Sequence, residues 1–192
     1  PILIPRPETE ILVEHAARIL GESCAGLVID VGTGTGAIPL ALARKQPAFQ
    51  YLGLDISDDA LALAGENAAA SASAPPAGTS VTWKKSNLLE GVTESAALIT
   101  ANLPYLTPAE IESAEPEVRH DPRLALEGGA DGLDFIRRLI PQAYRLAPVL
   151  LLECGPEQTP KVAALARETG FTQVAIHPDL TSRPRVVEAR RT

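Results

Sequence analysis

Short apolar runs alternate along the chain with longer segments in which apolar residues recur every three or four positions. The runs are rich in Val, Ile and Leu, which is typical of buried β-strands. We expect strands at Leu27–Val31, Gln50–Asp55, Ala97–Ala101, Val149–Glu153, Phe171–His177 and Arg185–Ala189, and another beginning at Val81. The periodic segments predict helices over Thr9–Leu20, Ala37–Lys45, Asp134–Leu146 and Thr159–Thr169, and one capped by Ser57.

Strands that alternate with helices predict an α/β fold with a parallel sheet and helices on both faces. The last two strands break this rhythm, because only about seven residues, Pro178 to Pro184, connect them. A parallel crossover needs a dozen or more residues, so these two strands should pair antiparallel. We therefore expect a seven-stranded, mostly parallel sheet that ends in an antiparallel hairpin. The low-complexity segment 71–80 predicts a mobile surface loop.

Composition narrows the possible partners. The 192 residues fit one domain, and the net charge of −7 opposes binding to nucleic acid by bulk electrostatics, although a local basic patch at Arg183, Arg185, Arg190 and Arg191 stays possible. Two cysteines are too few for a disulfide scaffold, which favours a reducing compartment; we expect the cytoplasm, with an organelle as the alternative. No apolar run approaches the ~20 residues of a membrane span.

His15, His120 and His177 are scattered along the sequence, so we predict packing or surface roles for them and no metal site.

A glycine-rich turn follows the first strand and begins a helix. It contains Gly32, Thr33, Gly34, Thr35 and Gly36, and glycines there allow tight turning and the close approach of a ligand to the backbone. Asp55 ends the second strand, 23 positions beyond Gly32, where a carboxylate can accept both hydroxyls of an adenosine ribose. The turn suits either NAD or S-adenosylmethionine (SAM). The terminal hairpin and Asp30, an acid just before the glycines, favour SAM.

The segment Asn102-Leu103-Pro104-Tyr105 follows the fourth strand, at the same edge of the sheet as the glycine turn. The Asn102 side-chain carbonyl and the Leu103 backbone carbonyl can converge on one planar NH2 group. Pro104 stiffens the turn, and Tyr105 supplies a flat face for a planar substrate. Two acceptors aimed at an NH2 group favour methylation at nitrogen, because they orient the lone pair and stabilise the developing charge.

Together these segments resemble the HemK-type protein-(glutamine-N5) methyltransferases, which modify peptide-chain release factors. The resemblance covers nearly the whole chain. It is carried by Ile4–Glu10, Asp30–Gly36, Asp55–Ser57, Asn102–Tyr105, Pro122–Gly132, and Asp179-Leu180 through Arg185–Val187.

The resemblance implies a class I SAM-dependent methyltransferase fold of the Rossmann-like type over residues 1–192. It implies methyl transfer to the glutamine amide of a Gly-Gly-Gln motif in a release factor. Asn102 and Tyr105 would be catalytic, and Leu103 and Pro104 would help to bind the substrate. The cofactor would contact the glycine turn, Asp55, Asn102, and Asn87 and Leu88 beside the adenine.

Three departures from the family pattern modify these expectations. Leu103 replaces a proline, which also makes the motif similar to that of rRNA adenine dimethylases. Asn87 replaces an aspartate, which predicts weaker SAM binding. The family's N-terminal helical domain is expected to be absent. The alternatives are an N6-adenine methyltransferase acting on RNA or DNA, a non-catalytic SAM-binding homologue, and a NAD-dependent oxidoreductase. The oligomeric state stays open.

Overall fold

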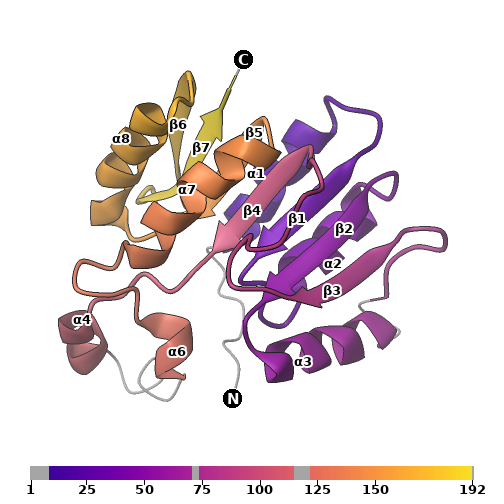
Figure 1. Cartoon of the computed structure of the whole chain (residues 1–192), viewed down its shortest axis with the longest axis horizontal. Helices are drawn as coiled ribbons and strands as arrows, with labels where there is room; N and C mark the ends of the chain where they lie inside the picture. The colour runs from indigo at the N-terminus through magenta and orange to yellow at the C-terminus, as the bar shows by residue number, and fades with distance from the viewer. Residues whose placement is uncertain (1–8, 71–73, 115–121, 192) are drawn as a thin grey trace.

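The computed structural model describes residues 9–70, 74–114 and 122–191. They contain a seven-stranded sheet in the order β3-β2-β1-β4-β5-β7-β6, in which β7 alone runs antiparallel to its neighbours (Figure 1). The expected fold class, including the terminal hairpin, is confirmed. The strands are β1 (Leu27–Val31), β2 (Gln50–Asp55), β3 (Val81–Lys85), β4 (Leu98–Asn102), β5 (Val149–Glu153), β6 (Gln173–Pro178) and β7 (Pro184–Arg190).

Helices cover both faces of this sheet (Figure 1). One face carries α1 (Thr9–Leu20), α2 (Ala37–Lys45) and α3 (Asp58–Ala69), and the other carries α7 (Asp134–Leu146) and α8 (Thr159–Thr169). All five were expected from the sequence. Two short helices were not, namely α4 (Pro108–Ser113) and α6 (Arg123–Leu126). A capping box between Thr107 and Glu110 starts α4, so the sequence did contain a signal for it.

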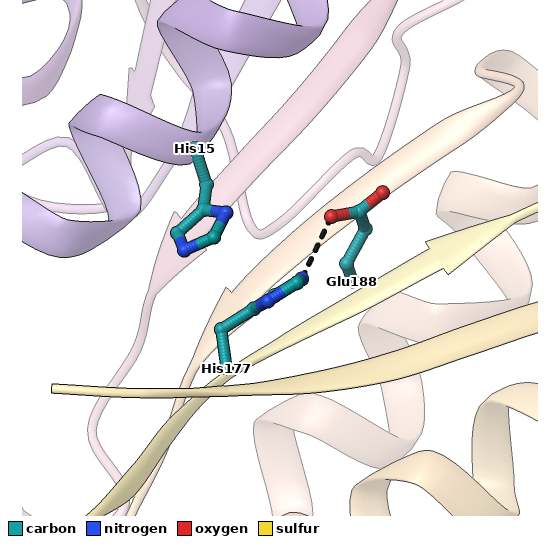
Figure 2. Close-up of side chains that lie close together, drawn as sticks. All are labelled: His15, His177 and Glu188. Carbon is teal, nitrogen blue, oxygen red and sulfur yellow. Dashed lines mark hydrogen bonds and ion pairs between the residues drawn. The ribbon is translucent and has the colours of Figure 1, made fainter. Parts of the chain in front are cut away.

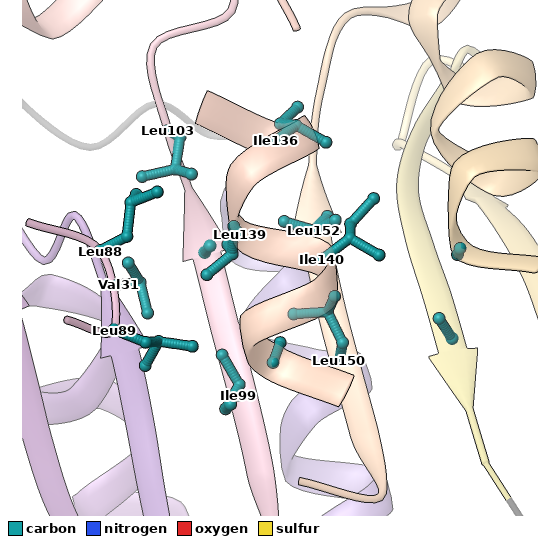
Figure 3. Close-up of a cluster of buried hydrophobic side chains, with 14 of the residues drawn as sticks. Val31, Leu88, Leu89, Ile99, Leu103, Ile136, Leu139, Ile140, Leu150 and Leu152 are labelled. Atoms are coloured by element: carbon teal, nitrogen blue, oxygen red, sulfur yellow. The ribbon is translucent and has the colours of Figure 1, made fainter. Parts of the chain in front are cut away.

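The core has two halves, because successive side chains of a strand point to opposite faces of the sheet. Val28, Leu98 and Leu151 face α1 and α2, whereas their neighbours Ile29 and Ile99 face the α7 side. Figure 3 shows the second half, where Leu103 continues the apolar layer beyond the end of β4, close to Val31 and Leu88. The apolar core therefore reaches to the sheet edge from which Asn102 to Tyr105 emerge.

Trp83 of β3 packs on Gly53 of β2, beside the glycine turn. A Cβ atom built on Gly53 would lie 2.5 Å from Trp83 Cζ3, and one on Gly36 would lie 2.6 Å from Trp83 Cη2. The indole thus occupies the space that these two glycines leave empty. It supports the glycine turn from the α3 side.

We predict that Gly53→Ala lowers the free energy of unfolding by about 1–3 kcal/mol, because the added methyl overlaps a ring that has no free space to enter. Gly65→Ala in α3 is the matched control, since no atom lies within 4 Å of its added Cβ and alanine favours a helix. Urea unfolding followed by Trp fluorescence measures both. Equal stability of the two variants would contradict this packing.

Candidate functional site

A cavity of about 380 Å³ opens at the carboxyl ends of β1, β2 and β4. Ligands of open α/β sheets bind at this edge. The residues that follow the three strands line it, together with parts of the β3–β4 connection, α1, α6 and α7. They include Thr9, Gly32–Thr35, Asp55–Ser57, Ser86–Leu88, Asn102–Pro104, Leu124, Phe135 and Arg138.

The glycine turn owes its shape to backbone conformations that favour glycine. Gly32, Gly34 and Gly36 all have positive φ, at 72°, 55° and 76°. The Gly32 and Thr33 N–H groups donate to the Leu54 carbonyl, at 2.8 and 2.9 Å, which ties the turn to the end of β2. Gly36 precedes α2 without a side-chain cap, so the turn leads into the positive end of that helix.

Asp55, the last residue of the neighbouring strand β2, accepts hydrogen bonds from the backbone at the turn and after it. Its Oδ2 accepts from the Gly34 N–H at 2.9 Å, and its Oδ1 accepts from the Ser57 N–H at 3.0 Å. Each carboxylate oxygen has a second lone pair, so the group can still accept hydrogen bonds from a ligand in the cavity. The two backbone bonds fix its orientation.

Asp30 lies at the base of the turn and is 1% exposed. Its Oδ1 accepts from the Thr100 hydroxyl at 2.7 Å, whereas Oδ2 is buried without a hydrogen-bond partner among the described residues. Burial, with a smaller contribution from the charge of nearby Asp55, raises the pKa of Asp30 to about 7. A buried carboxylate with one unsatisfied oxygen is suited to a cationic ligand group, which would restore its charge.

Asn102 is the last residue of β4, and its side chain lies at the cavity. Its Nδ2 donates to Thr9 Oγ1 at 3.1 Å, which leaves the amide oxygen as the acceptor. Leu103 is 5% exposed, and its side chain packs into the core against Gly32, where an added Cβ would lie 2.8 Å from Leu103 Cδ2. Leucine in place of the family's proline therefore serves as core.

The chain that follows Asn102 is held by the segment around Gly128. The N–H of Gly128 donates to the Leu106 carbonyl at 2.8 Å, and the N–H of Leu106 donates to the Leu126 carbonyl at 2.9 Å. A Cβ on Gly128 would lie 2.6 Å from the Pro104 carbonyl oxygen, so only glycine allows this approach. The segment around Gly128 thus packs directly behind the motif.

Tyr105 does not line the cavity, although the sequence predicted a flat face for the substrate. Its hydroxyl accepts from Arg185 Nη1 at 3.4 Å, and its carbonyl accepts from Gln158 Nε2 at 2.7 Å. Arg185 also lies 3.7 Å from Asp179 in the β6–β7 turn. The structure therefore places Tyr105 between the motif and the terminal hairpin.

Asn87 and Leu88 do line the cavity, but the Asn87 amide is already engaged. Its Oδ1 accepts from Arg138 Nη2 at 3.0 Å and its Nδ2 donates to Glu90 at 3.0 Å. Sequence reasoning missed Arg138, and also Phe135, because α7 follows Asn87 by almost 50 residues. Phe135 and Arg138 line the same cavity as Asn87 and Leu88, the first with an apolar side chain and the second with a charged one.

The histidines are less scattered than the sequence suggested. His15 and His177 stack with ring centroids 3.9 Å apart, and His177 Nε2 lies 2.8 Å from Glu188 (Figure 2). Glu188 also accepts from Arg190 at 2.6 Å, and one ligand atom from each of His15, His177 and Glu188 lies within 4.8 Å of the other two. The stacking of His15 on His177 joins α1 to the terminal hairpin, which fits the packing role that was predicted. His120 lies outside the described residues.

The predicted basic patch is not a single cluster. Arg183 and Arg185 stand at the start of β7, while Arg190 and Arg191 stand at its end, about 20 Å of strand away. Arg190 pairs with Glu188 and Glu22, and Arg191 lies over the Tyr144 ring. The four arginines therefore do not form one local patch, because an extended strand separates the first two from the last two.

A family model described as "Methyltransferase small domain" matches residues 7–118, more than half of the chain. The chain belongs to this family. A release factor glutamine methyltransferase of Deinococcus radiodurans is 45% identical over 192 residues, and that of Caulobacter vibrioides is 40% identical over 191. The family resemblance drawn from the motifs is confirmed. These alignments cover 98% and 97% of this chain but 66% and 65% of the relatives, so the chain spans about two thirds of their length.

Solved methyltransferases share the fold. The chain matches the catalytic domain of hMettl16 with a TM-score of 0.74 at 14% identity, over 98% of this chain and 71% of that one. It matches a ribosomal protein L11 methylase from Lactobacillus delbrueckii with a TM-score of 0.68 at 21% identity, over 96% and 79%. None of the described helices is long and apolar enough to cross a membrane.

The methyltransferase fold brings together most of the residues proposed for its site. The cavity joins Gly32, Thr33, Gly34, Thr35, Asp55, Asn87, Leu88, Asn102, Leu103 and Pro104, and it leaves out Gly36 and Tyr105. The signature segment Ile4–Glu10 lies outside the described residues except for its last two. One of these, Thr9, contacts Asn102 and was missed, since 93 positions separate the two residues.

We predict that the buried Asp30 makes stability depend on pH. Its pKa in the folded state, about 7, exceeds the unfolded value of 3.8, so folding takes up a proton between these values. Stability that is present at low pH is then lost as the pH rises from about 4 to 7, by roughly 3 kcal/mol between pH 5 and 8. Asp30→Asn should lack this loss. Urea unfolding of both proteins at the two pH values measures it, and parallel pH dependences would contradict the pKa.

Proposed function

We propose that the chain is a SAM-dependent enzyme that methylates the N5 nitrogen of the glutamine in the Gly-Gly-Gln motif of a peptide-chain release factor. The observation that carries this proposal is one cavity that joins the glycine turn and Asp55 to the Asn102 amide. The names of the relatives from Deinococcus and Caulobacter support the substrate. We propose residues 1–192 as the methyltransferase domain, acting in the cytoplasm, where translation takes place.

The residues at the sheet edge fit SAM. Asp55 offers lone pairs for the ribose hydroxyls, and the unsatisfied Oδ2 of Asp30 offers a negative charge to an amine. Ile56, Leu88 and Phe135 provide apolar surface for a flat base. When bound, SAM would supply an electrophilic methyl group on its sulfonium.

The residues at the end of β4 and directly after it, Asn102 and Leu103, would hold the substrate nitrogen. An amide nitrogen is a poor nucleophile because its lone pair is delocalised into the carbonyl. The Asn102 Oδ1 and the Leu103 carbonyl would accept both N–H bonds, which orients the NH2 group and stabilises positive charge as it develops. Alignment of nucleophile and methyl in one site can account for roughly 7–11 kcal/mol of the barrier. The protein's contribution is therefore positioning and electrostatics.

The alternative of an adenine substrate in nucleic acid gains no support from the described surface. Arg183 and Arg185 are separated from Arg190 and Arg191 by the length of β7, and the net charge is −7. A protein that binds nucleic acid through its phosphates needs several cations on one face. The likeness to an RNA-bound hMettl16 structure concerns the fold alone.

A transfer assay tests the proposed function. The chain is mixed with methyl-labelled SAM and a bacterial release factor, either unchanged or with alanine in place of the Gly-Gly-Gln glutamine. We expect label in the unchanged factor only. Equal labelling of both factors, or labelling of RNA or DNA but not of protein, would contradict the proposal.

We predict that two substitutions separate binding of the cofactor from transfer. Asn102→Ala removes an acceptor at the reacting nitrogen and should lower kcat by roughly 10²–10³, with little effect on SAM affinity. Asp55→Asn removes the charge that faces the ribose and should weaken SAM binding at least ~10-fold. Calorimetry gives the affinities, and labelled transfer at saturating SAM gives kcat. Full activity of Asn102→Ala would contradict its catalytic role.

A further inference from the structure

Thr9 connects the first helix to the catalytic motif. It is the first residue of α1, it is 5% exposed, and it lines the cavity. Its Oγ1 lies 3.1 Å from Asn102 Nδ2 and accepts a hydrogen bond from it. The contact joins two segments that are 93 positions apart, so it exists only in the folded chain.

The two ends of an asparagine amide have nearly the same shape but opposite hydrogen-bonding roles. With Nδ2 turned to Thr9, Oδ1 is the end that remains to accept a hydrogen bond in the cavity. The reversed amide would present an NH2 group to the NH2 group of a glutamine substrate, and neither could accept. The orientation of Asn102 therefore decides whether the site can hold its substrate.

From this contact we infer that Thr9 is a positioning residue for Asn102: its hydroxyl holds the Asn102 amide with Oδ1 toward the reacting nitrogen. The inference rests on the proposed function. A hydroxyl can also donate, so Thr9 alone permits either orientation. With the substrate NH2 group in place, only one orientation satisfies both ends of the amide. Thr9 and the substrate select it together.

The rest of α1 keeps Thr9 at this distance. Leu12 and Ala16 are fully buried, and the helix packs against β4 and β5. Farther along, His15 stacks on His177, as Figure 2 shows, and Arg18 lies 3.6 Å from Glu188. The helix thus contacts four strands, and its first residue cannot move away from Asn102 without disturbing these contacts.

A pair of substitutions tests the positioning role. Thr9→Val keeps the shape of the side chain but removes the oxygen, so Asn102 loses the partner of its Nδ2. We expect kcat for the release factor glutamine to fall about 10- to 100-fold, as follows from loss of a buried hydrogen bond at about 1–3 kcal/mol. Thr9→Ser retains the oxygen and should keep kcat within about 3-fold of the wild type.

Two further measurements distinguish positioning from a structural effect. SAM affinity by calorimetry and the midpoint of thermal unfolding should change little in Thr9→Val. Thr169→Val in α8 is the control, because it removes a threonine hydroxyl that also makes a hydrogen bond, to the Leu165 carbonyl at 2.8 Å, away from the cavity. It should leave kcat unchanged.

Each outcome decides the matter. A wild-type kcat in Thr9→Val overturns the positioning role and leaves the proposed function standing. An equal loss of kcat in the Val and Ser variants, or a loss of SAM binding and stability together, shows a structural role and also overturns it. A wild-type chain that does not methylate the glutamine overturns the proposed function and this inference with it.

Discussion

The register of three parallel strands is the constraint on which the site depends. Val31 at the end of β1 pairs with Leu54 of β2 on one side and with Ala101 of β4 on the other. The next residues along each strand are the glycine turn, Asp55 and Asn102, so one row of backbone pairs places all three at the same edge. A slip of one residue would turn Asp55 or Asn102 to the opposite face of the sheet. The apolar cores on both faces oppose such a slip, because it would move every side chain of the strand out of the core half that it fits and into the other.

The site contains buried polar atoms without hydrogen-bond partners, unlike the apolar core around it. Asp30 stands among buried aliphatic side chains with one oxygen unsatisfied, and the Thr33 hydroxyl is also buried without a partner among the described residues. Such groups cost stability in a protein without a ligand, and they occur where function requires them. Asp30 lies at the base of the glycine turn and Thr33 lies within it, which is where the proposed cofactor needs polar contacts. Leu103 and Trp83 lie against the glycines of the turn, so apolar side chains support the polar part of the site.

Local patterns in the sequence were sufficient to predict most of the fold. Short apolar runs located the seven strands, apolar periodicity located four of the five long helices, and the Ser57 cap located the fifth. The short connection after Pro178 predicted the antiparallel hairpin. Ligand-facing residues could be predicted where a motif directly follows a strand, as with Asp55 and Asn102. Contacts between distant segments could not, since no pattern in one segment indicates its partner. The contact of Thr9 with Asn102 and the stacking of His15 on His177 are of this kind. Tyr105 shows the same limit, because its neighbour Arg185 comes from the last strand.

The central claim is that the donor methyl and the Asn102 amide oxygen meet in one cavity. A crystal structure of the chain with S-adenosylhomocysteine, the demethylated product, tests it most directly. The account predicts the ribose at Asp55, the amine toward Asp30, and the sulfur directed to the side of the cavity formed by Asn102 and Pro104. A product bound away from the glycine turn, or an Asn102 side chain that points out of the cavity holding the sulfur, would contradict it.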